Sequence, residues 1–316
     1  MIILLGSSGY IGQAFQQALE NRGAKFAPLS RKEIDYTCFS KLLEHLRKTK
    51  ATFVINAAGF TGKPNVDACE SARAETLLGN SIFPVTVANA CSAAGIPWGH
   101  VSSGCIFQGA KILGHGAARV EKNLMAPEIQ LLREKNPEAV RGFTEEDAPN
   151  FSFRQPPCSF YSGTKALAEE ALLSAGDGFI WRLRIPFDQW DGPRNFLSKL
   201  QRYPKVYDNV NSLSHRRDFA EACLDLWERR APAGIYNVTN PGHVSSREVV
   251  RLIEKFLSPG RKFEFWAGDE EFYRSAAHAP RSNCVLDVSK LLAAGVKMRP
   301  VQDALEDSLR NWKTSS

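Results

Sequence analysis

The chain has 316 residues, about twice the usual length of a single domain, so one large or two modest domains are expected. Hydrophobic residues make up 43% of it and charged residues 23%, which excludes a disordered or fibrous protein. The formal net charge of +6 comes from basic residues that are scattered rather than clustered, so we expect no nucleic-acid partner and favour a small anionic ligand that carries phosphates.

The N-terminal part of the chain alternates between short apolar runs and amphipathic segments. Ile11, Phe15 and Leu19 illustrate the helical spacing of the first amphipathic segment, which ends at Gly23. In chain order, the pattern predicts strands at 1–5, 25–29, 52–56, 98–102 and 178–184, and helices at 12–22, 39–48, 76–94 and 164–174. This order predicts an α/β fold of the Rossmann type, a doubly wound parallel sheet covered by helices.

Two stretches interrupt the alternation. Residues 108–142 are long for a connection, and because 126–135 could form a short helix, we interpret them as an insertion over the surface that acts as a lid or an oligomer contact. Beyond Pro186 aromatic and basic residues accumulate, which indicates a smaller substrate-binding lobe. We therefore predict a dinucleotide-binding domain of residues 1–188 plus about 213–239, with the insertion inside it, and a lobe of about 189–212 plus 240–316.

Cysteine usage and hydropathy predict the compartment. No apolar stretch approaches the roughly 18 residues of a membrane helix, and the short apolar start lacks the basic residues of a signal peptide. The seven cysteines are far apart, and the nearest two are Cys91 and Cys105, which argues against a disulfide framework and against paired zinc ligands. The histidines show no ligand spacing either. We expect a reduced, cytoplasmic protein without a membrane partner or a metal.

A glycine-rich turn follows the first strand and opens the first helix. Glycines three positions apart let the backbone turn sharply and leave no side chain between the helix N-terminus and a pyrophosphate, which the unpaired N–H groups bind. A turn needed only for packing would show the same glycines. The place of the turn between a strand and a helix favours a dinucleotide site made of Gly6, Ser7, Ser8, Gly9, Tyr10, Ile11 and Gly12.

The end of the second strand distinguishes the two nicotinamide cofactors. NAD enzymes place an Asp or Glu there to bind the ribose 2′-hydroxyl, whereas this chain has Ser30-Arg31-Lys32. A guanidinium suits a 2′-phosphate, so Arg31 predicts NADPH, with NADH as the less favoured cofactor. An exposed loop residue without a ligand is the alternative for Arg31. Further cofactor contacts are predicted for Asp35, on the adenine, and for Asn56, Ala57, Ala58 and Gly59.

Tyr161 and Lys165 lie four residues apart at the start of a predicted helix, hence on one face. A phenol with a pKa of about 10 is a poor acid at neutral pH, but a neighbouring ammonium lowers that pKa and can also hold the cofactor ribose. Tyr161 could then protonate a carbonyl oxygen as hydride reaches its carbon. A hydroxyl at the end of the fourth strand, Ser102 or Ser103, would complete the contacts to that oxygen. Tyrosine and lysine also occur at this spacing by chance, and the N-terminal nucleotide turn favours the catalytic interpretation.

Further segments carry a resemblance that covers nearly the whole chain. They are Asn56-Ala57-Ala58-Gly59, Thr61-Gly62-Lys63-Pro64-Asn65-Val66-Asp67, Gly104-Cys105-Ile106-Phe107, Phe143-Thr144-Glu145-Glu146-Asp147, Ser159-Phe160-Tyr161-Ser162, Pro193-Arg194-Asn195-Phe196 and Ala279-Pro280-Arg281-Ser282-Asn283. With the glycine turn they resemble an extended short-chain dehydrogenase/reductase. They are similar to the bifunctional 3,5-epimerase/4-reductases of nucleotide-linked L-rhamnose synthesis in plants, and more distantly to the dTDP-4-dehydrorhamnose reductases. The chain departs from that family at 108–141, and at Ser103, where the family usually has threonine.

The resemblance implies NADPH-dependent conversion of a nucleotide 4-keto-6-deoxyglucose to a nucleotide-L-rhamnose-type sugar. In that ketosugar C3 and C5 flank the C4 ketone, so the hydroxyls of Ser103 and Tyr161 would also stabilise the enolate that epimerisation forms. By similarity to the family, Cys105 and Lys199 supply the base and the acid. If the fourth strand continues, Cys105 and Ser103 share a face. The alternatives are a buried structural thiol for Cys105 and an exposed surface lysine for Lys199.

The substrate contacts follow from chemistry and from the resemblance. Guanidinium groups bind phosphate oxygens bidentately, so Arg194 and Arg281, with Asn195, are candidates for the nucleotide-sugar diphosphate. Thr61, Asn65 and Asp67 are candidates for the sugar, with loop capping as the alternative.

Three functions remain open at this stage. The first is the bifunctional epimerase/reductase, the second is a 4-keto-reductase alone, and the third is a non-catalytic NADP-binding regulatory subunit. Intact Ser103, Tyr161 and Lys165 argue against the third. The identity of the nucleotide, UDP or dTDP, and the assembly, with a homodimer as one candidate, are left open.

Overall fold

The computed structural model describes residues 1–114 and 118–314, so residues 115–117 of the predicted insertion lie outside the described residues. The chain divides into two compact units, each with its own hydrophobic core. Unit 1 comprises Met1–Ile106, Pro149–Arg182 and Ala220–Tyr236, and unit 2 comprises Phe107–Ala148, Leu183–Phe219 and Asn237–Ser316.

Unit 1 is built on a six-stranded sheet in the order β2-β1-β3-β4-β8-β12. The pairs of β1 with β2, β1 with β3 and β3 with β4 are parallel. The chain order reverses at β1, and in such sheets ligands bind outside the carboxyl ends of the strands at this switch point. The strands are β1 (Ile2–Leu5), β2 (Phe26–Leu29), β3 (Phe53–Asn56), β4 (Trp98–Ser103), β8 (Gly178–Leu183) and β12 (Gly234–Asn237).

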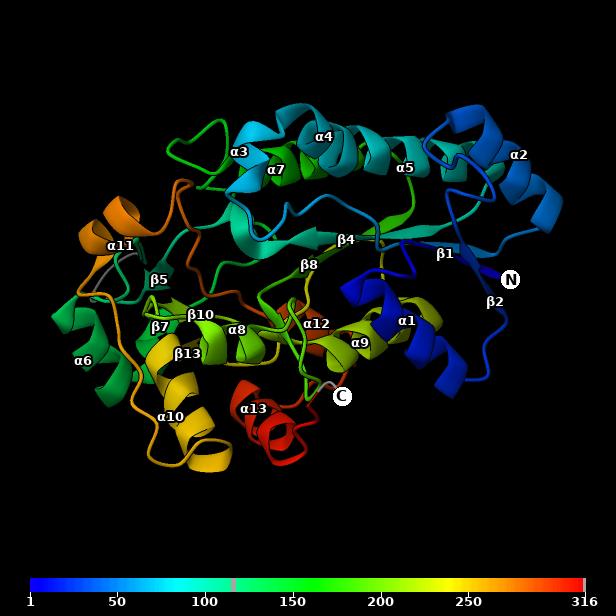
Figure 1. Ribbon diagram of the computed structural model, residues 1–316. Helices are drawn as coiled ribbons and strands as arrows, with labels where there is room; N and C mark the ends of the chain where they lie inside the picture. The colour runs from blue at the N-terminus through cyan, green and yellow to red at the C-terminus, as the bar shows by residue number, and fades with distance from the viewer. Residues whose placement is uncertain (115–117, 315–316) are drawn as a thin grey trace. The chain divides into compact units, whose positions relative to one another are not determined.

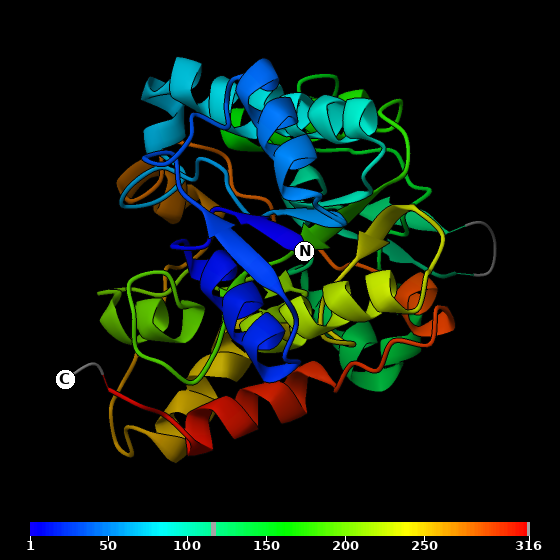
Figure 2. The same cartoon turned by 90° about the vertical axis from the view of Figure 1, so that its right-hand side faces the viewer.

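Helices cover both faces of this sheet, as Figures 1 and 2 show. On one face lie α2, α5 and α7, and on the other lie α1 and α9. Phe53 of β3 stacks on Trp227 of α9 with ring centroids 4.1 Å apart, and Phe15 of α1 packs on Trp181 of β8. The helical segments are α1 (Tyr10–Asn21), α2 (Phe39–Thr49), α3 (Ala68–Ser71), α4 (Arg73–Leu77), a π turn (Leu78–Ile82), α5 (Phe83–Ala94), a 3₁₀ turn (Gly104–Ile106), α7 (Phe160–Leu172) and α9 (Arg216–Glu228).

These elements match the predicted alternation closely, and the predicted doubly wound class is confirmed. One continuous helical stretch, Arg73–Ala94, has the length and composition of a membrane span, with 44% of its apolar window buried. Core helices of globular proteins pass the same test. Residues of this stretch, Phe83, Val87 and Ala90 among them, belong to the core of unit 1.

Unit 2 consists of short strands and helices. Its two-stranded sheets pair β10 with β13 and β11 with β9, and its three-stranded sheet has the order β6-β5-β7. The elements are β5 (Ala110–Ile112), β6 (Arg119–Glu121), α6 (Pro127–Lys135), a 3₁₀ turn (Pro137–Ala139), β7 (Val140–Arg141), β9 (Pro186–Phe187), α8 (Phe196–Arg202), β10 (Val210–Asn211), β11 (Ser214–His215), β13 (Val244–Ser245), α10 (Ser246–Phe256), α11 (Asp269–Ser275), α12 (Ser289–Ala293) and α13 (Val301–Arg310).

The division of the chain differs from the predicted one at the segment 107–148. This segment belongs to unit 2, whereas the sequence analysis placed its greater part, as an insertion, in the dinucleotide-binding domain. The expectation that it lies over the surface is wrong, because its apolar residues form a core with Val210 and Val285. Those residues are Ala110, Ile112, Leu124, Ile129 and Val140. The segment is thus a structural part of unit 2, although the predicted short helix within it is present as α6.

Shortening Ile129 tests this role. Ile129 is 2% exposed, so Ile129→Ala should lower the free energy of unfolding by about 2–5 kcal/mol, the usual cost of an aliphatic core truncation. Leu131 lies on the same helix but is 49% exposed, and Leu131→Ala should change the value by about 0.5 kcal/mol or less. Chemical denaturation measures both. If both substitutions lowered the free energy of unfolding by the same small amount, the segment 107–148 would be a surface insertion after all.

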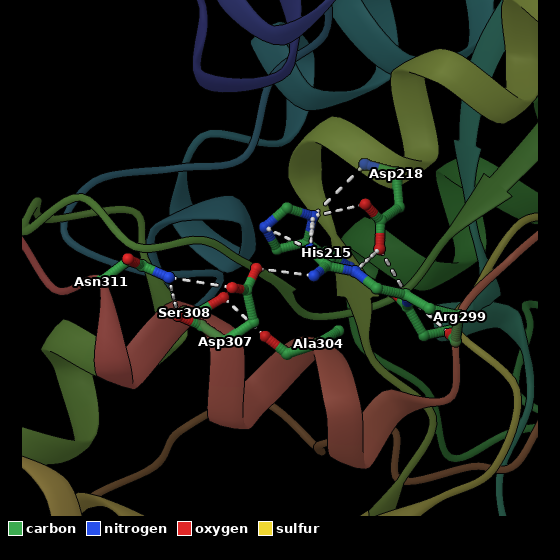
Figure 3. Close-up of polar contacts among 8 residues, drawn as sticks. His215, Asp218, Arg299, Ala304, Asp307, Ser308 and Asn311 are labelled. Carbon is green, nitrogen blue, oxygen red and sulfur yellow. Dashed lines mark hydrogen bonds and ion pairs between the residues drawn. The ribbon is translucent and has the colours of Figure 1, made fainter.

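A polar cluster ties the start of α9 to α13 within unit 2 (Figure 3). Arg299 lies between two carboxylates, with its Nε 2.7 Å from Asp218 and its Nη1 2.6 Å from Asp307. His215 Nδ1 lies 3.0 Å from the other oxygen of Asp218. Burial raises the pKa of Asp218, but the hydrogen bonds with His215 and Arg299 outweigh it and hold that pKa at about 2. These contacts anchor the chain where it leaves unit 2 for unit 1.

Candidate active site

The nucleotide turn has the geometry that an anion requires. A Cβ atom at Gly12 would lie 2.0 Å from the carbonyl oxygen of Gly6, so the helix can pack on the turn only with glycine there. Gly6 has φ +75°, which favours glycine. At Gly9 a Cβ would lie 3.2 Å from the Gly6 oxygen, and among the described residues no side chain caps the N-terminus of α1. The N-terminus of this 12-residue helix, the positive end of its dipole, therefore lies at the turn, where it favours a phosphate.

The loop after β2 is more complex than its sequence suggested. Arg31 is exposed, as a 2′-phosphate ligand must be. The carboxylate of Glu33 folds back to accept a hydrogen bond from the Ser30 N–H at 2.8 Å, which places an acidic group at the strand end that the sequence analysis did not expect. The predicted adenine residue, Asp35, accepts hydrogen bonds from the N–H and hydroxyl of Thr37, and these bonds lower its pKa.

The segment after β3 leads directly to Lys165. Asn56 is buried and its side chain accepts a hydrogen bond from the Ala58 N–H at 3.1 Å. A Cβ atom at Gly59 would lie 3.6 Å from Lys165 Nζ. Asn80, in the π turn, accepts from the Phe60 N–H at 2.9 Å and donates to the Phe60 carbonyl at 2.7 Å. The structure thus brings the predicted cofactor segment 56–59 beside the predicted catalytic lysine.

Tyr161 and Lys165 occupy the first two turns of α7, as predicted. Ser159 caps this helix by accepting a hydrogen bond from the Ser162 N–H at 3.1 Å. Tyr161 is half-buried and Lys165 is buried, and Lys165 Nζ donates to the carbonyl oxygen of Val101 on β4 at 3.3 Å. Burial lowers the pKa of Lys165 to about 8, although the charges of Cys105 and Glu169 oppose this.

The structure distinguishes the two candidate hydroxyls of β4. Ser102 is buried, and its hydroxyl donates to the Glu169 carboxylate at 2.5 Å, so it is already engaged. Ser103 is half-buried at the last position of the strand, and its oxygen accepts a hydrogen bond from the Cys105 N–H at 3.3 Å. Ser103 is therefore the residue whose hydroxyl can reach a ligand beyond the strand.

Cys105 does not lie where a continued strand would place it. The strand β4 ends at Ser103, and Gly104–Ile106 forms a 3₁₀ turn. The alternation of side chains that would give Ser103 and Cys105 a common face stops at this turn, so the condition on which that expectation depended is not met. Cys105 is 6% exposed. Its backbone N–H donates to Ser103 Oγ at 3.3 Å, so the residue lies next to the candidate hydroxyl.

The predicted residues of unit 2 divide into two groups. Asn195 is fully buried and caps α8: its side chain accepts from the Leu197 N–H and donates to Asp188 and the Trp190 carbonyl. These bonds give Asn195 a capping role within unit 2, and they engage its amide hydrogens and one lone pair of its oxygen. Lys199 and Arg194 are half-buried near each other, and burial, followed by the charge of Arg194, lowers the pKa of Lys199.

The other predicted substrate residues are partly engaged within their own units. Arg281 is half-buried, donates from Nη1 to the Ala279 carbonyl at 3.1 Å and lies over the Phe272 ring. In unit 1, Asn65 accepts from the Asp67 N–H at 2.8 Å, the local capping that was the alternative interpretation. Thr61 and Asp67 are half-buried beside it. The described residues contain no group of three His, Cys, Asp or Glu side chains that could hold a metal ion.

Sequence reasoning missed two residues that shape this site, Asn80 and Glu169. Both are buried polar residues. Asn80 precedes a largely apolar run at 82–91, which was the available signal for it. Glu169, in contrast, stands beside Glu170 in a helix of mixed polarity, and nothing in the sequence set it apart. Asn80 holds the segment beside Lys165, and Glu169 lies one helical turn after Lys165.

Comparisons with known proteins decide the family. The family model described as the RmlD substrate binding domain matches residues 1–314 of the sequence. The chain belongs to this family. It is 31% identical over 306 residues to the bifunctional dTDP-4-dehydrorhamnose 3,5-epimerase/dTDP-4-dehydrorhamnose reductase of Arabidopsis thaliana. This match covers 96% of the chain and 90% of that relative. The resemblance found in the motifs is thereby confirmed, and as a member of the RmlD family the chain is an oxidoreductase of the nucleotide-sugar type.

Other relatives are longer. A trifunctional UDP-glucose 4,6-dehydratase/UDP-4-keto-6-deoxy-D-glucose 3,5-epimerase/UDP-4-keto-L-rhamnose-reductase of Arabidopsis thaliana is 31% identical over 305 residues. The match covers 96% of this chain but 40% of that relative. The chain therefore spans less than half of the trifunctional protein.

Solved structures share the fold. The L780 UDP-rhamnose synthase from Acanthamoeba polyphaga mimivirus superimposes with a TM-score of 0.81 at 23% identity, over 98% of both chains. The dTDP-4-dehydrorhamnose reductase from Bacillus anthracis in complex with NADP gives a TM-score of 0.75 at 20% identity, over 98% of this chain and 97% of that one. These likenesses confirm the predicted Rossmann-type fold, a doubly wound parallel sheet covered by helices.

Proposed function

We propose that the chain is an NADPH-dependent 3,5-epimerase/4-keto-reductase that converts a nucleotide 4-keto-6-deoxyglucose to a nucleotide-L-rhamnose-type sugar. The observation that carries the reductase part is the position of Lys165, between the end of β4 and the cofactor segment at Gly59. A lysine there can hold a cofactor ribose and act on the phenol of Tyr161, one helical turn earlier. Family membership supports a nucleotide 4-keto sugar as the substrate.

The residues of unit 1 account for the reduction. The N-terminus of α1 and the turn Gly6–Gly12 fit a dinucleotide pyrophosphate, and the nicotinamide of the bound cofactor supplies a hydride. Tyr161 gives its proton to the C4 oxygen, and Ser103 donates a hydrogen bond to the same oxygen. In this proposal the ammonium of Lys165, one helical turn after Tyr161, stabilises the phenolate that forms as the proton leaves.

Epimerisation requires a base and an acid in addition. Cys105 is proposed as the base, because its thiol follows Ser103 in the turn that ends β4 and its charge acts on Lys165. The ammonium of Lys165 would in turn favour the thiolate form. Lys199 is proposed as the acid, and its lowered pKa suits proton donation. The hydroxyls of Ser103 and Tyr161 that assist reduction would hold the enolate oxygen formed when C3 or C5 loses its proton.

A reductase without epimerase activity is the second candidate. The observation that favours it is the end of β4 at Ser103, which removes the expected common face of Ser103 and Cys105. The two candidates share the same first test. Wild-type protein supplied with a nucleotide 4-keto-rhamnose should oxidise NADPH stoichiometrically and form the 6-deoxyhexose. No turnover with either the UDP- or the dTDP-linked sugar would leave the non-catalytic subunit as the better explanation.

Cofactor preference tests the loop after β2. Arg31→Ala should raise the KM for NADPH roughly tenfold or more, the effect of losing a charge-assisted hydrogen bond, and leave the KM for NADH nearly unchanged. Glu33→Gln keeps the hydrogen bond from Ser30 and removes the negative charge, so it should not raise the KM for NADPH. Steady-state kinetics with both cofactors measure these effects. Equal losses with both cofactors would show that Arg31 does not contact the 2′-phosphate.

We propose that the protein acts in the cytoplasm. All seven cysteines are free thiols, which supports the expected reducing, cytoplasmic compartment.

A further inference from the structure

A buried polar network lies against the helix that carries Tyr161 and Lys165. Glu169 of α7 and Arg182 of β8 form an ion pair whose side chains are 4% and 2% exposed. Arg182 donates to Glu169 Oε2 from Nη2 at 2.8 Å and from Nε at 3.0 Å. Ser102 of β4 donates to the other carboxylate oxygen at 2.5 Å. The hydrogen bonds to the carboxylate thus come from two strands of the sheet.

This network is more than packing requires. Removing two charges from water is costly, and apolar residues of similar volume often stabilise a protein equally well. The network also lies at a particular place. Glu169 follows Lys165 by one helical turn, and Ser102 lies between Val101, whose carbonyl accepts the Lys165 hydrogen bond, and Ser103. Two adjacent residues of β4 therefore hold the same face of α7.

We propose that Glu169, held by Arg182 and Ser102, is a positioning residue that fixes Lys165 in its buried place and keeps its side chain an ammonium. What the ammonium then does in catalysis rests on the proposed function. The position and protonation of Lys165 do not, and they can be measured separately.

The titratable groups around Lys165 come from three elements. Glu169 acts from its own helix, Cys105 from the 3₁₀ turn, and His100 faces it from β4. Burial and the charge of Lys165 lower the pKa of His100 well below its usual value, so this imidazole is neutral and adds no cation. An ammonium is present below its pKa and is lost as the pH rises through it. Removal of the Glu169 carboxylate should therefore move the loss of the Lys165 ammonium to lower pH.

The test compares two neighbouring glutamates on α7. Glu169→Gln keeps the size of the side chain and an acceptor for Ser102, and it removes the charge. The titration of Lys165 Nζ is followed by NMR on lysine-labelled protein, with its resonance assigned by its loss in Lys165→Met. The alkaline limb of kcat for ketone reduction is measured in parallel. In Glu169→Gln both midpoints should fall by roughly one pH unit. Glu170→Gln, which breaks an exposed ion pair with Arg154, should leave both unchanged.

A second variant guards against loss of the fold. Glu169→Gln alone leaves Arg182 as a buried, unpaired cation, whereas Glu169→Gln/Arg182→Met removes both charges. The double variant should fold and show a shift in the same direction, smaller than that of the single variant because the charge of Arg182, which contacts Glu169 at 2.8 Å, is removed as well. A folded double variant with a wild-type Lys165 titration would overturn the proposal and leave the network a purely structural role. If Lys165→Met retained full reductase activity, the proposed function would fail instead, and the Lys165 titration would still decide the role of Glu169.

Discussion

Tyr161→Phe should lower kcat for reduction of a nucleotide 4-keto-rhamnose roughly 10²–10⁴-fold, the usual cost of losing a general acid. Phenylalanine keeps the ring and removes the proton that the C4 oxygen must receive as hydride arrives. Lys165 and the turn at Gly6–Gly12 stay in place, so the Kd for NADPH, measured by fluorescence titration, should change little. Proton exchange at C3 and C5 should fall less than reduction, because Ser103 would still bind the enolate oxygen.

The matched control for this variant is Tyr236→Phe. Tyr236 is buried in unit 1, and its hydroxyl donates to the Pro232 carbonyl at 2.8 Å. Its loss should lower the free energy of unfolding by about 1 kcal/mol without changing kcat. If Tyr161→Phe reduced the sugar at the wild-type rate, the proton would have to come from another group, and the assignment of α7 to the reactive centre would fail.

Cys105→Ala should separate the two reactions. We expect it to abolish solvent proton exchange at C3 and C5 while reduction of a sugar that is already epimerised continues at close to the wild-type rate. The physical reason is that the proposed thiolate removes ring protons, whereas reduction depends on Tyr161, Lys165 and Ser103. The measurements are NMR of the exchanging ring protons without cofactor turnover and NADPH oxidation with the epimerised substrate.

Cys223→Ala is the control, because Cys223 is a buried thiol of α9 in the same unit. It should reduce stability and leave both reactions intact. Exchange at the wild-type rate in Cys105→Ala would make the thiol structural and would favour the reductase without epimerase activity. Loss of both reactions would mean that Cys105 shapes the whole site rather than acting on ring protons.

Local features of this protein were readable from its sequence. The turn Gly6–Gly12 and the helix that begins beside Tyr161 depend on residues close in the chain, and the structure has them where they were predicted. The topology also places the turn and this helix at the same edge of the sheet, because the carboxyl ends of parallel strands lie together at one edge.

Features that depend on distant residues could not be read in this way. The expected surface insertion has the length of a connection, but its apolar residues find partners in Val210 and Val285, far along the chain. The choice between Ser102 and Ser103 depended on Glu169, because its carboxylate accepts the hydrogen bond of the Ser102 hydroxyl and not that of Ser103. Asn195 illustrates a different limit, because its motif suggested a ligand whereas its hydrogen bonds cap a helix.

The central claim, epimerisation and reduction by one chain, is tested most directly with isotope. The protein is supplied with a nucleotide 4-keto-6-deoxyglucose and NADPH in deuterated water, and the 6-deoxyhexose product is examined by NMR and mass spectrometry. The proposed chemistry predicts deuterium at both C3 and C5, because each proton is exchanged with solvent before hydride reaches C4. A reduced product with no deuterium at either carbon would contradict it and would show a reductase that does not epimerise its substrate.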